Sequence, residues 1–175
     1  MNTRRTTNTT RHLRRSDPEM TALAALQERL GQARREFRCC DTGFVVQATG
    51  LRADRAVSTA KQTAETLEAQ LDAFDETSAV SQLNREGTVT NTHVARIVER
   101  GLAYRERTNL VFDIQQGRTE RQLKAFLRGE AASPPERFDR DTVGIDVARD
   151  RVSTENRLDL IGLAKGYIVD VAAST

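Results

Sequence analysis

The sequence predicts an α+β domain in which antiparallel strands are covered by packed helices. The first observation is an amphipathic pattern over residues 52–74, where apolar side chains recur every three or four positions. The second is the presence of β-prone runs within residues 37–49 and 143–154. The third is the order of the elements, which does not alternate strand and helix as a doubly wound sheet does.

Composition limits the class of protein. The 175 residues suffice for one domain with a tail, which we divide into residues 1–19 and 20–175. Basic and acidic side chains nearly balance, at 27 Lys+Arg and 25 Asp+Glu, so we expect no nucleic-acid partner for the chain as a whole. No apolar run approaches the roughly 20 residues that span a bilayer, and no secretory leader is visible. We therefore expect no membrane span and a cytoplasmic location.

Residues 1–19 are rich in Thr, Asn and Arg, a composition that buries too little apolar surface to fold alone. We interpret this segment as a disordered basic tail. The alternative is an arm that binds nucleic acid, for which strongly salt-dependent binding would be the signature.

The two cysteines, Cys39 and Cys40, are adjacent in the sequence. Neighbouring cysteines rarely form a disulfide because the geometry is strained. They do not form a C-x-x-C pair, and no clustered His accompanies them, so the spacing argues against a structural zinc site. We interpret both as buried strand residues.

Helices and strands follow from the periodicity of apolar residues. A leucine pattern predicts a helix over residues 19–37, and the β-prone run at Phe44–Val46 predicts a strand over residues 37–49. The regular stripe over residues 52–74 predicts the longest helix, which we interpret as a packing helix. Residues 76–84 are expected to form a turn or short helix, with Ser78 as a possible N-cap.

The second half of the chain continues with helices and a hairpin. Residues 92–107 follow a helical period, with His93 in the first turn, where a lone His is typical of a surface position. Residues 119–129 are expected to form a polar helix with inward side chains; residues 131–140 a loop; and residues 143–154 a hairpin turning at 148–150. The expected inward side chains of the polar helix are Leu123, Phe126 and Leu127.

The stretch Leu158–Asp170 combines an apolar run with two glycines four residues apart, Gly162 and Gly166. We interpret it as a strand, a turn and a helix. Glycines allow a sharp turn and a close approach of a ligand, and the first N–H groups of a helix favour an anion such as phosphate. Lys165 adds a cation. The alternative is an ordinary strand-to-helix connection, since the stretch is neither a Walker loop nor a dinucleotide fingerprint.

Four blocks, in order, resemble the FAD:protein FMN transferase family, also called ApbE-type flavin transferases. Leu158–Asp170 is similar to the family's "D-L-G-G-I-A-K-G-Y-x-V-D" block. Residues 40–46 resemble its early "M-G-T" strand, with Cys at the Met position and Asp at the Gly position. Residues 74–84 resemble its "S-E-V-S-R-L-N" block, and residues 111–113 resemble "A-F-D". For residues 111–113, the alternative is a short buried strand.

The resemblance implies a transferase fold and activity. In that family, FAD is the substrate, Mg²⁺ sits on its pyrophosphate, and a Ser or Thr hydroxyl of a target flavoprotein takes the FMN group. The resemblance places one metal ligand at the backbone carbonyl of Ala164. Together, the blocks predict the following cofactor-binding residues: Cys40, Phe74, Val111, Phe112, Asp113, Ile161, Lys165 and Tyr167.

The resemblance also implies that the sequence corresponds to the N-terminal portion of the family domain. The family's other metal ligands and a His-containing block lie further downstream than Thr175, so we name no catalytic residue. Two hypotheses remain. The chain is an FAD:protein FMN transferase, which can be inactive alone because of its truncation, or it is a non-catalytic remnant or interaction protein that has lost the flavin pocket.

Overall fold

The computed structural model describes residues 31–135 and 144–175. They form an α+β fold with antiparallel strands and packed helices, as predicted. The elements, in chain order, are β1 (Gln32–Cys39), β2 (Thr42–Thr49), α2 (Ala53–Leu71), α3 (Ala79–Glu86), β3 (Thr88–Thr90), α4 (Thr92–Arg107), the 3-10 turn η1 (Ile114–Gln116), α5 (Gly117–Leu127), β4 (Ile145–Ala148), β5 (Arg151–Thr154) and α6 (Ile161–Ala173).

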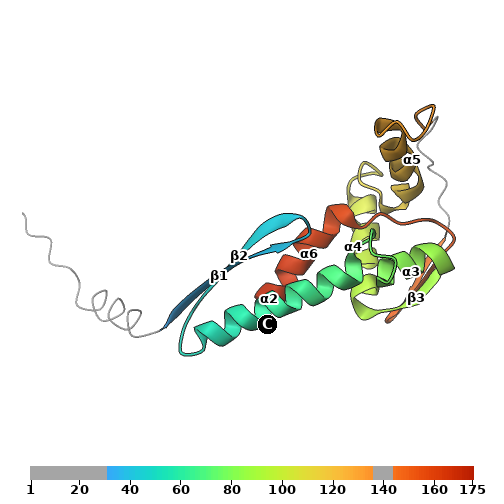
Figure 1. The fold of residues 1–175 in the computed structure, drawn as a ribbon. Coiled ribbons are helices and arrows are strands. Elements are labelled where there is room, and N and C mark those ends of the chain that lie inside the picture. Colours follow the sequence, from blue (N-terminus) through green and yellow to red (C-terminus); the bar gives the residue numbers. More distant parts are fainter. Residues whose placement is uncertain (1–30, 136–143) are drawn as a thin grey trace, which may run out of the picture.

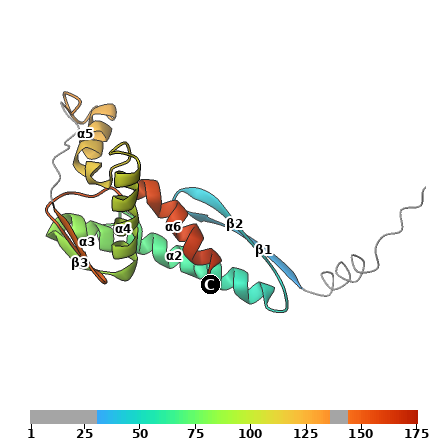
Figure 2. The ribbon, with the colours of Figure 1, turned by 180° about the vertical axis from the view of Figure 1, so that it is seen from behind.

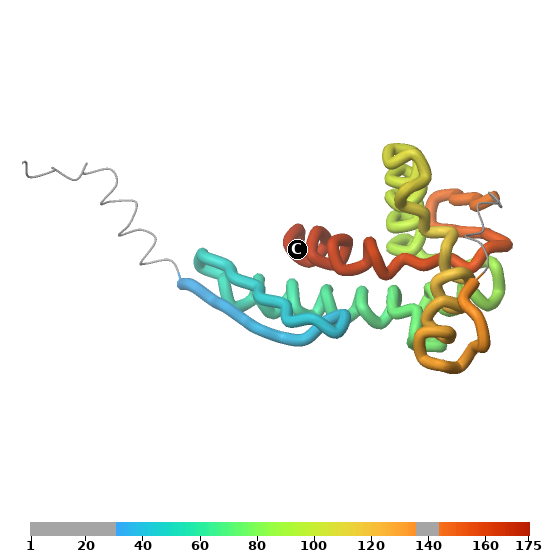
Figure 3. The backbone as a smooth tube through the Cα atoms, turned by 90° about the horizontal axis from the view of Figure 1, so that it is seen from above, coloured from blue at the N-terminus to red at the C-terminus, as the bar shows by residue number. Residues whose placement is uncertain are grey.

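The long helix α2 organises the molecule. Its apolar stripe contacts the β1–β2 hairpin and α6 over most of its length, and α3 follows at its C-terminal end. Figure 1 shows the hairpin and α6 beside α2, with α3, β3 and α5 at the other end of the molecule. The view from behind shows the same separation (Figure 2). Seen from above, α6 runs alongside α2 (Figure 3).

The described residues also form two small sheets. β1 and β2 form one antiparallel pair, and β3, β5 and β4 form a three-stranded antiparallel sheet in that order. The main core lies between α2, α4, α6 and the second sheet, and includes the fully buried Leu67, Ile97, Val152 and Ile168. The burial of such aliphatic side chains, each worth about 1.5–3 kcal/mol, is the main source of stability.

Capping signals in the sequence agree with the structure. The Ser78 side chain accepts a hydrogen bond from the Ser81 N–H and caps α3, as predicted. Asn91 caps α4 in the same way, accepting from His93 and Val94. Gly87, with φ of 74°, ends α3 in the left-handed conformation that glycine adopts without steric cost.

The N-terminal expectations need correction. The predicted helix over 19–37 is wrong from Gln32 onward, since those residues pair with β2, and residues 19–30 lie outside the described ranges. The predicted single strand over 37–49 is two strands joined by Cys40 and Asp41. Both joining residues have positive φ, 51° and 55°, which makes a type I′ turn. Non-glycine residues rarely adopt this conformation, so the turn has no glycine signal in the sequence.

The structure also differs from three predictions for the second half of the chain. Residues 158–160 form no strand, and α6 begins at Ile161, so both glycines of the motif lie inside the helix rather than in a turn. Residues 111–113 form an irregular bend, not a buried strand, with Val111 89% exposed. Leu127 points outward from α5 and is 72% exposed.

The hairpin near residue 150 is confirmed for β4 and β5, although Val143 lies outside the described residues. The proposed loop at 131–140 is irregular over 131–135 and is not described beyond that. The basic tail at 1–19 likewise lies outside the description. No described helix is long and apolar enough to cross a membrane.

Candidate functional site

A pocket of about 350 Å³ opens between the β1–β2 turn, the end of α2 and the start of α6. It brings together five residues that the sequence nominated: Cys40, Phe74, Ile161, Ala164 and Lys165. They come from three segments far apart in the chain, and the packing of α6 against α2 places them side by side. The remaining lining residues are Asp41, Glu68, Leu71, Asp72 and Ala73.

Lys165 connects α6 to the hairpin. Its Nζ donates a 2.8 Å hydrogen bond to Oγ1 of Thr42, across 123 positions of sequence. The lysine is exposed, and among the described residues that line the pocket it is the one cation beside three carboxylates. The pocket is therefore negative overall, and an unaccompanied phosphate would meet net repulsion.

Phe74 lies between two hollows. Its ring is 73% exposed, and Nζ of Lys124 lies 5.7 Å from the ring centroid. A second hollow of about 600 Å³ shares Ala73, Phe74 and Ile161 with the pocket. Its basic lining residues come from α3, from α5 and the residue after it, and from the segment between β5 and α6: Arg85, Arg121, Lys124, Arg128 and Arg157.

The start of α6 is held by a bidentate contact. Nδ2 of Asn84 donates to the Leu158 carbonyl at 3.0 Å, and the Leu158 N–H donates to Oδ1 of Asn84 at 2.7 Å. Oδ1 of Asp159 then accepts from the Ile161 N–H at 2.8 Å. These bonds fix where the helix begins and hence where Ile161 and Lys165 lie.

The other predicted site residues lie elsewhere. Phe112 packs its ring edge-on against Tyr104, at 6.2 Å between centroids, and approaches Gly162. Asp113 caps η1 by accepting from Gln115, and one carboxylate oxygen lies 3.1 Å from Nε of Arg105. Val111 faces solvent. The described pocket therefore does not include the bend at 111–113.

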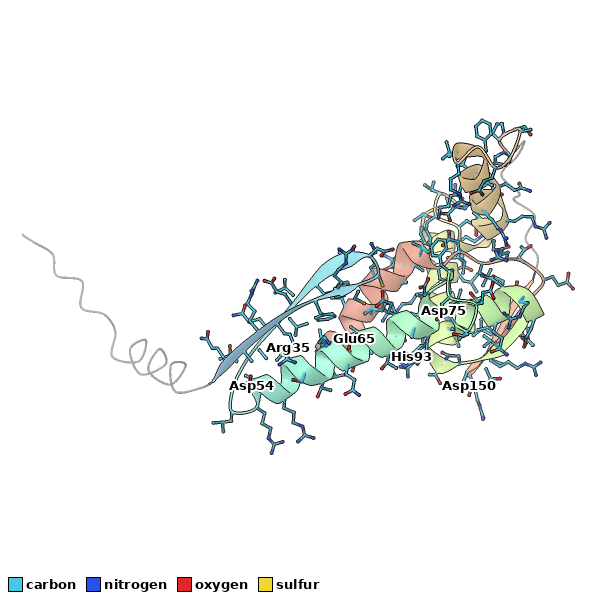
Figure 4. All side chains as sticks on the ribbon, in the orientation of Figure 1. Arg35, Asp54, Glu65, Asp75, His93 and Asp150 are labelled. Atoms are coloured by element: carbon cyan, nitrogen blue, oxygen red, sulfur yellow. The ribbon has the colours of Figure 1, made fainter. Side chains whose placement is uncertain are left out.

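Tyr167 is also outside the pocket. It is only 3% exposed, its hydroxyl lies 2.8 Å from Nδ1 of His93, and the Arg100 guanidinium stacks over its ring at 5.2 Å. His93 is thus a partly buried partner of Tyr167 rather than the surface residue that the sequence indicated. Figure 4 marks its place on the ribbon.

Sequence reasoning missed the acidic wall of the pocket. Glu68 and Asp72 lie at the C-terminal end of α2, and Asp41 lies in the hairpin turn. In the sequence, Glu68 sits off the apolar stripe of α2 and reads as an ordinary solvated position. Its N–H donor, Cys40, becomes a neighbour only when the hairpin packs on the helix.

Burial alters the chemistry of the pocket's thiol. Burial raises the pKa of Cys40, and Glu68 and Asp72 raise it further, while Cys39 and Lys165 oppose the shift. The free thiol is therefore protonated at neutral pH.

Several residues of the pocket carry oxygen atoms of the kind that could hold a magnesium ion. Asp41, Glu68 and Asp72 supply carboxylates beside Ala164, whose helical carbonyl retains a second lone pair. Mg²⁺ is typically held by one or two carboxylates together with substrate phosphates. The described residues do not gather three carboxylates closely enough to hold the ion by themselves.

Comparison with known proteins identifies a family and similar structures. A model of the ApbE family matches residues 40–175. The ApbE protein of Thermotoga maritima has a similar structure, with a TM-score of 0.67 and 19% identity over 81% of this chain and 51% of that chain. The flavin transferase ApbE of Vibrio cholerae gives 0.62 and 16%, over 83% and 53%. The chain thus spans about half the length of these proteins. No curated protein matches the sequence.

Proposed function

Because the chain belongs to the ApbE family, we propose that it forms the FAD-binding part of an FAD:protein FMN transferase. Its substrates would be FAD and a Ser or Thr hydroxyl of a target flavoprotein. The observation that carries the proposal is the pocket that collects Cys40, Phe74, Ile161, Ala164 and Lys165.

The two hollows suit the two ends of a dinucleotide. Phe74 offers an exposed aromatic face for a flavin or adenine ring. On one side lies the pocket with Lys165, and on the other lies the hollow rich in arginine. Arginine forks bind phosphate oxygens in pairs, so this second hollow supports the binding of a nucleotide phosphate.

The charge of the pocket supports a dependence on Mg²⁺. A diphosphate placed beside Asp41, Glu68 and Asp72 needs a cation in addition to Lys165. When bound there, Mg²⁺ would neutralise the charge of the phosphates, with Ala164 and the carboxylates as the candidate ligands.

The proposed reaction is a transfer of the FMN phosphoryl group. The oxygen of the acceptor hydroxyl forms a bond to the FMN phosphorus, the bond from that phosphorus to the AMP oxygen breaks, and AMP leaves. The hydroxyl proton passes to a base. We assign the binding and orientation of the substrate to the residues named above. We do not assign the proton transfer to His93, because this side chain is hydrogen-bonded to Tyr167 and lies outside the pocket.

FAD titration of the purified chain tests the proposal, with flavin fluorescence as the readout and with or without Mg²⁺. We expect saturable binding that Mg²⁺ strengthens. Phe74→Ala should weaken binding by up to about tenfold through loss of the ring contact. The matched control is Leu51→Ala, an apolar side chain 90% exposed in the turn before α2.

A second pair of variants tests whether the positive charge of Lys165 contributes to FAD binding. Lys165→Gln should weaken FAD binding, whereas Lys61→Gln should not, since Lys61 is paired with Glu65 on α2 and does not line the pocket. If the protein is shown to be folded by circular dichroism but does not bind FAD in either condition, the proposal fails. The non-catalytic alternative would then describe the chain.

A further inference from the structure

Two thiols and a carboxylate meet at the edge of the pocket. The sulfurs of Cys39 and Cys40 lie 3.8 Å apart, and one carboxylate oxygen of Glu68 lies within 4.8 Å of both. Among the residues that the structure describes, no other group of three His, Cys, Asp or Glu side chains comes as close together. Both cysteines are free rather than joined in a disulfide.

The hairpin turn explains how neighbouring cysteines come to share one side. Successive side chains in a strand point to opposite faces, so adjacent cysteines would normally diverge. Cys39 ends β1, while Cys40 has a positive φ in the turn, and the thiols meet instead of separating. The spacing of the two cysteines along the chain gave no sign that their sulfurs lie together with the Glu68 carboxylate.

The spacing of the sulfurs matches a tetrahedral thiolate site. With zinc–sulfur bonds of about 2.3 Å, two ligands of a tetrahedral ion lie about 3.8 Å apart. We propose that Cys39, Cys40 and Glu68 form a binding site for a thiophilic divalent cation of the Zn²⁺ type. Thiolate ligands distinguish this site from the oxygen ligands that Mg²⁺ prefers.

The surroundings of the cluster allow an ion to enter. Cys39 is 1% exposed and sits in the core, whereas Cys40 and Glu68 line the pocket. The Glu68 carboxylate also accepts a hydrogen bond from the Cys40 N–H, which holds helix and turn together. Three protein ligands leave one position for water or another ligand, as in zinc sites with an open position.

Binding must release protons, because the thiolate, and not the thiol, is the metal ligand. The affinity for the cation should therefore rise with pH.

The test uses the full chain, reduced and treated with a chelator, and titrated with Co²⁺ as a spectroscopic substitute for Zn²⁺. We expect one Co²⁺ per chain with thiolate-to-cobalt absorption, and displacement of Co²⁺ by Zn²⁺. Cys40→Ser should remove the absorption and weaken binding by more than the roughly 10–100-fold typical of losing an outer-shell partner. This variant changes a half-buried turn residue, so it is less disruptive than a change at Cys39.

Glu68→Gln tests the carboxylate, and Glu65→Gln is its control. Glu65 lies exposed on the same helix, three residues earlier (Figure 4). We expect weaker binding for Glu68→Gln and unchanged binding for Glu65→Gln. The proposed site would be ruled out if the folded chain showed no thiolate-to-cobalt absorption. It would also be ruled out if Cys40→Ser or Glu68→Gln kept the full affinity for Co²⁺. Since no FAD is present, the result is independent of the proposed function.

Discussion

The hydroxyl of Tyr167 lies 2.8 Å from Nδ1 of His93, which joins the middle of α6 to the first turn of α4. The ring of Tyr167 also packs edge-on against the imidazole, at 5.9 Å between centroids. This contact places Tyr167 in the core between two helices. It gives the residue a structural role that the sequence motif did not indicate.

Tyr167→Phe should lower the free energy of unfolding by about 0.5–1.5 kcal/mol, through loss of one hydrogen bond with little change in packing. Urea denaturation measures this loss. FAD affinity should stay unchanged, because Tyr167 does not line the pocket. Weaker FAD binding at unchanged stability would instead support the flavin contact that the resemblance implies.

His93 should make stability depend on pH. Burial, and then Arg96, lowers the pKa of His93 from its ordinary value of 6.5. The unfolded state therefore binds a proton more readily than the folded state does. The contribution of neutral His93 to the free energy of unfolding is complete above pH 6.5, and it is lost as the pH falls through the pKa of the folded state. Unfolding free energies measured between pH 8 and pH 5 should show this decline, which His93→Gln should reduce. An identical decline in the variant would contradict the assignment.

Asp113→Ala should destabilise the chain by roughly 3 kcal/mol, because it removes a carboxylate that pairs with the nearly buried Arg105 guanidinium. The side chains of this pair are 13% and 9% exposed. The cap on η1 is lost in the same variant. Chemical denaturation measures the change, with Asp146→Ala on the exposed side of β4 as the control. Equal effects of the two substitutions would contradict a special role for the pair.

Gly101 and Gly166 provide a matched pair of helical glycines. A Cβ on Gly101 would lie 2.6 Å from a methyl carbon of Ile114, whereas one on Gly166 would meet nothing within 4 Å. Gly101→Ala should therefore cost about 1–3 kcal/mol by overpacking. Gly166→Ala should add about 0.5–1 kcal/mol, since alanine favours helix. Thermal unfolding of both variants compares them directly. Equal changes in the melting temperature would show that Ile114 moves aside at little cost when a Cβ is added at Gly101.

Elements whose signals are local could be predicted from the amino-acid sequence alone. The stripe of α2, the period of α4, the Ser78 cap and the β4–β5 hairpin all depend on residues a few positions apart, so they could be predicted. The four blocks likewise indicated the family and five residues of the pocket.

Which distant residues meet, and which way each side chain faces, depends on the packing of the whole fold. Pairing with β2 made a strand of residues 32–37, and the unusual positive φ of Cys40 and Asp41 turned the chain where no glycine indicated a turn. The same packing set Glu68 beside two thiols and Lys165 beside Thr42. These contacts span tens of residues, and their formation depends on burial of the whole core rather than on any local preference.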